Sequence, residues 1–204
     1  MKQRLIALRY LAGLIAVHMA LGLVGFAQAA GGQAPKPATP AAPAVAAKEW
    51  PKERIGGLVA EWTRAMNWTK EYIEKMPEDA MSFKPIPEVR SFSEQMLHLA
   101  SANFFYGNRG TGAANPYQGK DLTKMEELKT KAGLTKVVME SYDYVIKSLQ
   151  AMDATKLEER MVARGMNLPR AEFLVMGFEH QSHHRGQTTI YLRMKGVTPP
   201  PEPF

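Results

Sequence analysis

A chain of 204 residues with 45% hydrophobic and 23% charged side chains can bury one substantial core and is globular in composition. Its formal charge of +6 includes Lys2, Arg4 and Arg9, which leaves about 23 basic side chains (26 − 3) against 20 acidic ones. This near balance, without a dense Lys/Arg stripe, does not indicate nucleic-acid binding. The absence of cysteine excludes disulfides, thiolate metal sites, a cysteine nucleophile and a lipoprotein anchor.

Residues 1–29 have the pattern of an export signal. Basic residues precede an apolar run at 11–26, and Ala27-Gln28-Ala29 is the small-x-small pattern of a signal-peptidase site. The run is short for a membrane span, and no stop-transfer charges follow it directly. A retained anchor is the alternative. We expect cleavage after Ala29 or Ala30 and a periplasmic or secreted product without a stable membrane anchor.

Residues 30–48 consist almost wholly of Ala, Pro and Gly. Such a segment cannot bury a core, and its prolines favour an extended, semi-rigid tether. We therefore expect a Pro/Ala-rich linker at 30–48 and a folded domain at 49–204.

The first two of four predicted helices lie on either side of a proline-containing connection. Apolar side chains at spacings of three and four predict a helix over residues 54–76, which Pro77 ends. The second helix begins at Ser91, because Ser91-Phe92-Ser93-Glu94 fits a capping box in which Glu94 reaches back to the Ser91 backbone. We expect it to end near the glycines at 107 and 110.

The other two helices complete the domain. A loop at 107–119 and a short helical piece at 121–128 precede a helix over residues 135–152. After a mixed connection at 153–167, Pro169 suits the first turn of a fourth helix and Gly196 its C-terminal end. No stretch shows the period-two alternation of strands between hairpin turns. The sequence therefore predicts an all-α domain, a four-helix bundle with long connections.

Three of the five histidines lie within five positions of the fourth helix. On a helix, His180 and His184 lie about 40° apart around the axis and one turn apart along it, as in helical His-x-x-x-His metal sites. They share one line with apolar and small residues, which indicates that the pair faces the bundle interior. That line contains Phe173, Gly177, His180, His184, Gln187, Tyr191 and Met194.

His98 is the other histidine of the expected mature domain, in the middle of the second helix. Bundle interiors commonly hold metals on side chains from facing helices. We therefore predict one divalent metal ion on His98, His180 and His184. Three neutral imidazoles suit Zn²⁺ or Ni²⁺, and Fe²⁺, Mn²⁺ and Cu²⁺ accept the same ligands. At least one coordination position stays open, as in catalytic sites.

The spacing leaves alternatives for this site. His183 lies about 60° from His180 on the other side of the helix and could replace His184. We prefer His184 because it continues the buried line. The histidines could also be core side chains that merely satisfy one another.

The neighbouring polar residues allow more than one interpretation. Glu94 could orient or ligate the metal beside His98 instead of capping its helix. Gln187 and Tyr191 could hydrogen-bond metal-bound water or substrate, could support the ligands, or could be ordinary core residues.

The segments that contain these histidines resemble the motifs of a known family. Arg90-Ser91-Phe92-Ser93-Glu94-Gln95-Met96-Leu97-His98-Leu99-Ala100, followed by Asn103, resembles the second-helix motif of the DinB-like (DinB/YfiT) family of metalloenzymes. His180-Gln181-Ser182-His183-His184-Arg185-Gly186-Gln187, followed by Arg193 and residues 196–200, is similar to that family's closing helix and tail. The resemblance covers about residues 51–200.

The resemblance implies a DinB/YfiT-like four-helix bundle with long crossover connections, and frequent homodimers. It also implies a divalent metal on three histidines that match His98, His180 and His184. Better-understood relatives are metal-dependent transferases or isomerases that act with low-molecular-weight thiols. This chain differs from the usual pattern in its export signal and tether.

We therefore expect an exported, metal-dependent enzyme of transferase or hydrolase type that acts on an unknown small molecule. Its catalytic residues are unknown, with His183 and Tyr191 as candidates for the general base. The alternative is a non-catalytic protein that binds a metal or a small ligand in stress defence.

Overall fold

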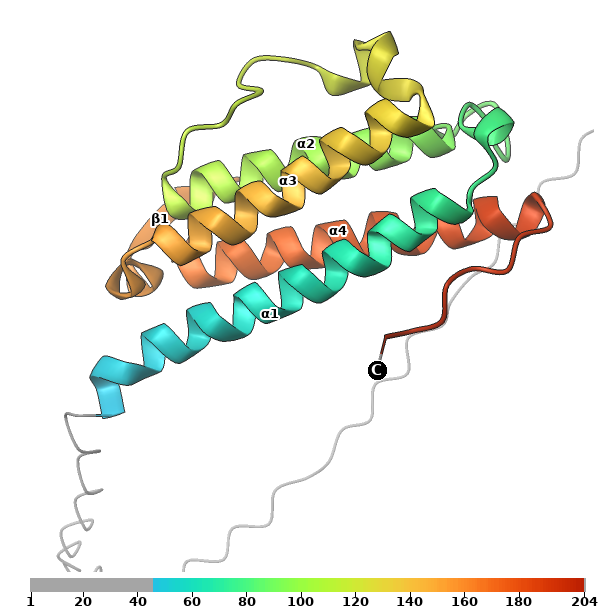
Figure 1. Ribbon diagram of the computed structural model, residues 1–204. Helices are drawn as coiled ribbons and strands as arrows, with labels where there is room; N and C mark the ends of the chain where they lie inside the picture. Colours follow the sequence, from blue (N-terminus) through green and yellow to red (C-terminus); the bar gives the residue numbers. More distant parts are fainter. Residues whose placement is uncertain (1–45, 204) are drawn as a thin grey trace, which may run out of the picture. The chain divides into compact units, whose positions relative to one another are not determined.

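The computed structural model describes residues 46–203, with side chains from residue 52 on (Figure 1). The expected signal at 1–29 and most of the expected linker at 30–48 lie outside the described residues. Helix α1 begins at Ala46, so the last three residues of the expected linker are helical. No helix in the described part of the chain combines the length and apolarity that a membrane span requires.

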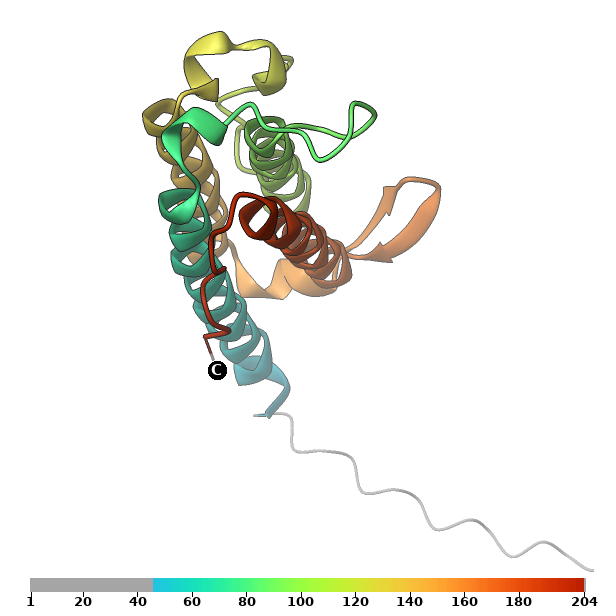
Figure 2. The same cartoon turned by 90° about the vertical axis from the view of Figure 1, so that its right-hand side faces the viewer.

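In the described part of the chain, four long helices form a bundle, which confirms the all-α prediction. They are α1 (Ala46–Lys75), α2 (Phe92–Thr111), α3 (Lys131–Ala151) and α4 (Arg170–Met194). Helix α2 packs on α3 and α4, while α1 packs mainly on α3 and less on α4 (Figures 1 and 2). In Figure 1, α2 and α3 run in the same direction, so the chain between them must cross back along the bundle.

The connections between the helices contain short 3₁₀ turns. The α2–α3 crossover holds η2 (Leu122–Lys124) and η3 (Glu126–Lys129), where the sequence predicted a short helical piece. Two further turns are η1 (Glu78–Ala80) after α1 and η4 (Ala154–Glu158) after α3.

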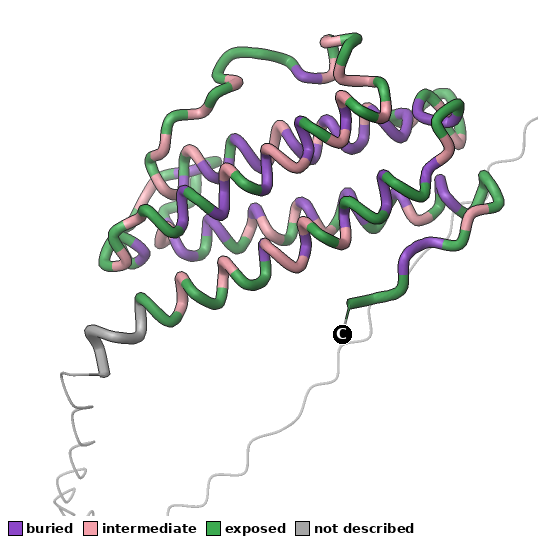
Figure 3. The backbone as a smooth tube through the Cα atoms, viewed as in Figure 1, coloured by how far each residue is buried: buried purple, intermediate pink, exposed green. Residues whose placement is uncertain are grey.

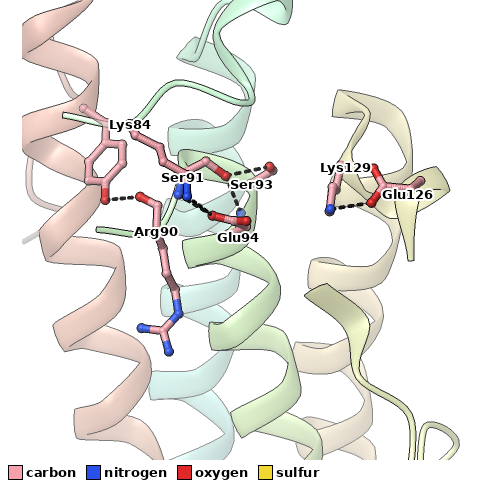
Figure 4. A network of polar contacts seen from close by, with 8 residues as sticks. Lys84, Arg90, Ser91, Ser93, Glu94, Glu126 and Lys129 are labelled. Atoms are coloured by element: carbon pink, nitrogen blue, oxygen red, sulfur yellow. Dashed lines mark hydrogen bonds and ion pairs between the residues drawn. The ribbon is translucent and has the colours of Figure 1, made fainter. Parts of the chain in front are cut away.

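The capping box at the start of α2 is present in full (Figure 4). The Glu94 backbone N–H donates to Ser91 Oγ at 3.2 Å, and the Ser91 backbone N–H donates to the Glu94 carboxylate at 2.7 Å. The second of these bonds is the main cause that lowers the pKa of Glu94, and Lys84, 3.3 Å from the carboxylate, also lowers it. Glu94 therefore caps the helix, and it does not belong to the histidine cluster described below.

Helix α2 continues through the two glycines that were expected to end it. A Cβ atom on Gly110 would lie 2.5 Å from Cδ2 of Leu174, and one on Gly107 would lie 2.7 Å from Cε1 of Tyr144. These glycines therefore allow neighbouring side chains to approach the helix. The helix ends at Thr111, one residue after Gly110 and thus close to the expected end, and its C-cap is Gly112, whose φ of +87° is left-handed.

An antiparallel hairpin in the expected mixed connection was not predicted from the sequence. Strands β1 (Arg160–Ala163) and β2 (Met166–Pro169) pair with Met161 opposite Leu168. Each strand has four residues, which is too short for a period-two pattern to stand out. The two-residue turn has positive φ at Arg164 (51°) and Gly165 (77°), as in the type I′ turns of tight hairpins.

The core lies between the four helices, on the sides that face one another in Figure 3. Its largest fully buried aromatic side chains include Trp62, Phe92, Phe104 and Tyr142. A second, smaller cluster packs the hairpin against α2 and α4. Its buried members are Tyr106, Ala163, Leu168 and Phe173. Because α2 and α4 contact each other directly, the middles of both helices can contribute to one site.

Candidate metal centre

Three imidazoles from α2 and α4 meet in the middle of the bundle. The ring centroid of His98 lies 5.2 Å from that of His180 and 4.6 Å from that of His184. One ligand nitrogen from each of the three residues lies within 4.8 Å of the others. In the described part of the chain, this is the one such group of histidine and carboxylate side chains. The structure thus brings together the three residues that the sequence singled out.

The closest pair within the cluster is His180 and His184, whose Nε2 atoms are 3.2 Å apart. Two imidazole nitrogens bound to one tetrahedral Zn²⁺ at 2.0–2.1 Å would be about 3.3 Å apart. The pair therefore already has the spacing of two ligands on one ion. The third ligand atom, on His98, lies within 4.8 Å of the other two, so it would have to move closer to reach the spacing of about 3.3 Å in such a set.

The orientation of His184 is set by a hydrogen-bonded glutamine pair. Gln187 Oε1 lies 2.9 Å from His184 Nδ1 and also accepts a hydrogen bond from Gln95 Nε2. Because an amide oxygen can only accept, the proton of His184 is on Nδ1. The Nε2 lone pair of His184 therefore points to His180. This is how proteins orient metal-binding histidines through the second ring nitrogen.

His180 is held differently. Its ring centroid lies 5.8 Å from that of Tyr106, and Tyr106 in turn packs on Phe173 at 4.9 Å. Its Nδ1 is buried and has no hydrogen-bond partner among the described residues. In the metal-free protein, His180 Nε2–H can donate to His184 Nε2, and a metal ion would take the place of that proton. The residues present therefore fit a metal ion.

All three imidazoles are neutral at neutral pH. Burial is the main cause that lowers the pKa of His180 and of His184 to about 4, and their like-charged neighbours lower it further. The pKa of His98 is also lowered, first by burial and then by the positive charge of Arg90. A neutral imidazole carries the lone pair that a metal ion needs. Burial of the cluster thus keeps it in its ligand form.

His183 lies beside the cluster and outside it. Its ring centroid is 4.9 Å from that of His184, but its side chain is exposed and supplies no nitrogen to the group of three. The geometry therefore favours His184 over His183 as the third candidate ligand.

Tyr191 has a hydrogen-bond partner within the protein, because its hydroxyl donates to the Arg90 carbonyl at 2.7 Å. Tyr191 thus anchors the segment before α2.

A groove opens beside His184, between α4 and the segment that leads into α2. Its volume is about 850 Å³, within the usual range for small-molecule sites. His183, His184 and Gln187 line it from α4, Arg90 lines it from the segment before α2, and Gln95 lines it from the first turn of α2. A small molecule in this groove would therefore lie next to the histidine cluster.

Two arginines lie near the cluster, and sequence reasoning missed both. Arg164, in the hairpin turn, has its Cζ 5.8 Å from the ring centroid of Tyr106, and its charge lowers the pKa of His180. Arg90 lowers the pKa of His180 and His98 from the other side. No carboxylate is among the main influences on the three histidines. The positive charges of both arginines therefore disfavour protonation of these histidines.

Sequence comparison places the chain among known proteins. Residues 52–202 match the family model described as DinB family. The uncharacterized protein YjoA of Bacillus subtilis (strain 168) is 27% identical over 143 residues, which are 69% of this chain and 90% of YjoA. The uncharacterized protein YrdA of the same organism is 41% identical over 44 residues, 22% of this chain and 26% of YrdA.

Comparison with solved structures supports the same fold. The crystal structure of the DinB-like protein YjoA from Bacillus subtilis has a TM-score of 0.57 and 24% identity, over 71% of this chain and 95% of that one. A DinB-like protein from Bacillus cereus ATCC 10987 has a TM-score of 0.60 and 22% identity, over 72% and 95%. At these identities the structures show the fold alone.

Proposed function

The chain belongs to the DinB family, and from this premise we propose that it binds one divalent metal ion through His98, His180 and His184. The observation that supports the proposal best is the convergence of three neutral imidazoles, with ligand atoms within 4.8 Å, from two helices.

The ligand chemistry narrows the choice of metal. Imidazole nitrogens suit Zn²⁺ and Ni²⁺ best, while Mg²⁺ and Ca²⁺ prefer oxygen ligands that this cluster does not offer. Zn²⁺ or Ni²⁺ is therefore the metal we propose, and Fe²⁺ and Mn²⁺ are the next candidates. Three protein ligands leave at least one coordination position open for water or a substrate, as in catalytic zinc sites.

We further propose that the protein is an enzyme of transferase or hydrolase type that acts on a small molecule. A bound ion would supply Lewis acidity and lower the pKa of a coordinated group. The chain's own residues would orient the ligands and bind the substrate. Gln187 holds His184 in its ligand tautomer, the groove admits a substrate beside the cluster, and the exposed His183, which lines that groove, is the candidate general base.

Export is the remaining part of the proposal. It rests on the basic, apolar and Ala27-Gln28-Ala29 pattern of residues 1–29. Fractionation of cells that express the full chain, with mass spectrometry of the mature N-terminus, tests it. Protein that starts at Ala30 or Gly31 outside the cytoplasm is the expected result. Uncleaved protein in the cytoplasm would contradict export, and uncleaved protein in the membrane would indicate a retained anchor.

Metal analysis of protein purified without a histidine tag tests metal binding. We expect about one equivalent of Zn²⁺ or Ni²⁺ in the wild type and a loss of most of it in His98→Ala. The matched control is His183→Ala, which removes an exposed histidine beside the cluster and should keep the metal. A full equivalent of metal in His98→Ala would contradict the three-histidine site.

Turnover assays separate an enzyme from a binding protein. Thiol-addition and hydrolysis substrates should be screened with the metal-loaded protein, with and without a chelator. Turnover that the chelator abolishes and that added metal restores is the expected result. Metal binding without any turnover would instead support the alternative, a non-catalytic protein that binds a metal or a small ligand.

A further inference from the structure

Among the residues that the structure describes, the groove beside His184 combines an apolar wall with one cationic side chain, Arg90. The apolar wall includes Pro85, Ile86, Val89 and Ile190. Ile86 and Ile190 are 54% and 55% exposed, although large aliphatic side chains are usually buried. Isolated exposed apolar residues need no explanation, but here several gather in one concave surface. That surface can cover the apolar body of a ligand.

Arg90 supplies the cation. It lines the groove, and its guanidinium makes no ion pair or side-chain hydrogen bond with any residue that the structure describes. Figure 4 shows its side chain extending away from the Ser91–Glu94 contacts, with no dashed line at the guanidinium. The backbone at Arg90 is held in place, because its carbonyl accepts the hydrogen bond from Tyr191. The exposed guanidinium is therefore available to an anion, while the backbone that carries it is anchored.

The charged side chains of the groove indicate which charge the bound anion should have. A guanidinium pairs with a carboxylate through two parallel hydrogen bonds, which makes a carboxylate a well-matched ligand for one arginine. Glu88 lines the same groove and would repel a second negative charge. A monoanion with an apolar body therefore fits the groove better than a phosphate dianion.

We propose that this groove binds a small monocarboxylic acid, with its carboxylate on Arg90 and its apolar body on the wall formed by Ile86 and Ile190. The proposal deepens the proposed function, since it names the substrate class for the site that contains the metal-binding histidines. The carboxylate on Arg90 would hold the molecule in the groove that His184 also lines. This placement leaves the position at the metal free for the reacting part of the molecule.

Hexanoate is a suitable probe, and hexan-1-ol is its uncharged match. Amide shifts in NMR titrations of the metal-free protein report binding independently of activity. We expect hexanoate to produce saturable shifts at residues around Arg90 and Ile190 and to bind more tightly than hexan-1-ol. Arg90→Gln should weaken hexanoate about five- to tenfold and leave hexan-1-ol unchanged, because it removes one charge-assisted contact. This variant keeps the backbone carbonyl that Tyr191 uses.

Two further variants control the test. Arg193→Gln removes an exposed arginine that does not line the groove, and should leave hexanoate binding unchanged. Ile190→Ala should weaken both probes, because both use the apolar wall. Equal hexanoate affinity in the wild type and Arg90→Gln, or no preference over hexan-1-ol, would overturn the proposal.

The outcome can be separated from that of the metal proposal. Arg90-dependent hexanoate binding in a protein that takes up no metal would support the groove assignment and contradict the proposed metal site. If the protein takes up metal and Arg90→Gln does not change hexanoate binding, the metal site is supported and the groove assignment is contradicted.

Discussion

Gly177 of α4 faces Tyr106 of α2 so closely that a Cβ atom on the glycine would lie 2.7 Å from the Cβ of Tyr106 and 2.8 Å from its Cγ. Real Cβ atoms do not come so near to another side chain, and the base of Tyr106 cannot rotate away. Gly177 also lies one turn before His180, whose ring packs on Tyr106. The distance between α2 and α4 beside the candidate metal centre therefore depends on the missing side chain.

Gly177→Ala should push α4 away from α2. We expect a loss of about 1–3 kcal/mol in the free energy of unfolding, typical of overpacking, and weaker metal binding because His180 moves relative to His98. Urea unfolding of the metal-free protein and competition with a chelating dye measure the two effects. The control is Gly186→Ala on the same helix, where a Cβ would meet no atom within 4 Å.

Gly186→Ala should leave metal binding unchanged and stabilise the protein by about 0.5–1 kcal/mol, because alanine has the higher helix propensity. Similar effects of the two substitutions would show that close contact with Tyr106 is not what requires glycine at position 177.

The hydrogen bond between Gln187 and His184 gives a second test. Gln187→Leu removes the acceptor that keeps the His184 proton on Nδ1. Metal affinity should fall about 10- to 100-fold, as for other partners of metal-binding histidines. Gln187→Glu should keep the affinity, because a carboxylate accepts the same hydrogen bond. Dissociation constants from Zn²⁺ competition would show the difference, and a Leu variant that binds Zn²⁺ as tightly as the wild type would rule out this role.

Much of the candidate site could be predicted from the sequence, because it follows from helical geometry. Residues four apart lie on the same face of a helix, as His180 and His184 do, and the apolar residues on that face indicated that it points to the bundle interior. The structure confirms the bundle and the clustering with His98. The start of α2 was also predictable, since a capping box is a local pattern that the Ser91 and Glu94 side chains complete by themselves.

The remaining features depend on contacts between distant segments. Gly107 and Gly110 resemble helix terminators in the sequence, but the side chains of Tyr144 and Leu174 explain them. The hairpin that carries Arg164 is too short to show a strand pattern, and its packing against α2 and α4 holds it in place. No local signal could place this arginine beside His180, because its neighbours are far away in the sequence.

The stability of the metal-free protein should fall as the pH is lowered from about 6.5 to 4. The pKa values of His180 and His184 are about 4 in the folded protein, against an ordinary value of 6.5. Between these values the unfolded chain binds more protons than the folded one, so acid favours unfolding. Above pH 6.5 both states are neutral at these residues and their contribution is constant.

Urea unfolding between pH 7.5 and 4.5 measures this dependence. Carboxylates also titrate near the lower limit, so the control is the variant His98→Gln/His180→Gln/His184→Gln. The wild type should lose more stability than this variant over the same range. Parallel curves for the two proteins would mean that the histidines are not protonated more readily after unfolding.

Arg185, on the side of α4 behind the histidines, should contribute strongly to stability. It is 6% exposed and has no carboxylate partner among the described residues. Its Nη1 donates to Gln181 Oε1 at 2.7 Å, and its Cζ lies 4.2 Å from the ring centroid of Trp68. Gln181 Oε1 also accepts a hydrogen bond from Tyr142, at 2.8 Å, so the network joins α4 to α1 and α3.

Arg185→Ala should therefore lower the free energy of unfolding by about 2–4 kcal/mol, through a lost cation–π contact and a cavity. Arg185→Met should lower it by less, because methionine fills most of the space and carries no buried charge. Arg193→Ala removes an exposed arginine from the same helix and should change stability by no more than about 0.5 kcal/mol. Urea unfolding ranks the three variants. If Arg185→Ala is as stable as Arg193→Ala, the buried guanidinium does not hold α4 against α1 and α3, and packing of the apolar core alone must orient His180 and His184 toward His98.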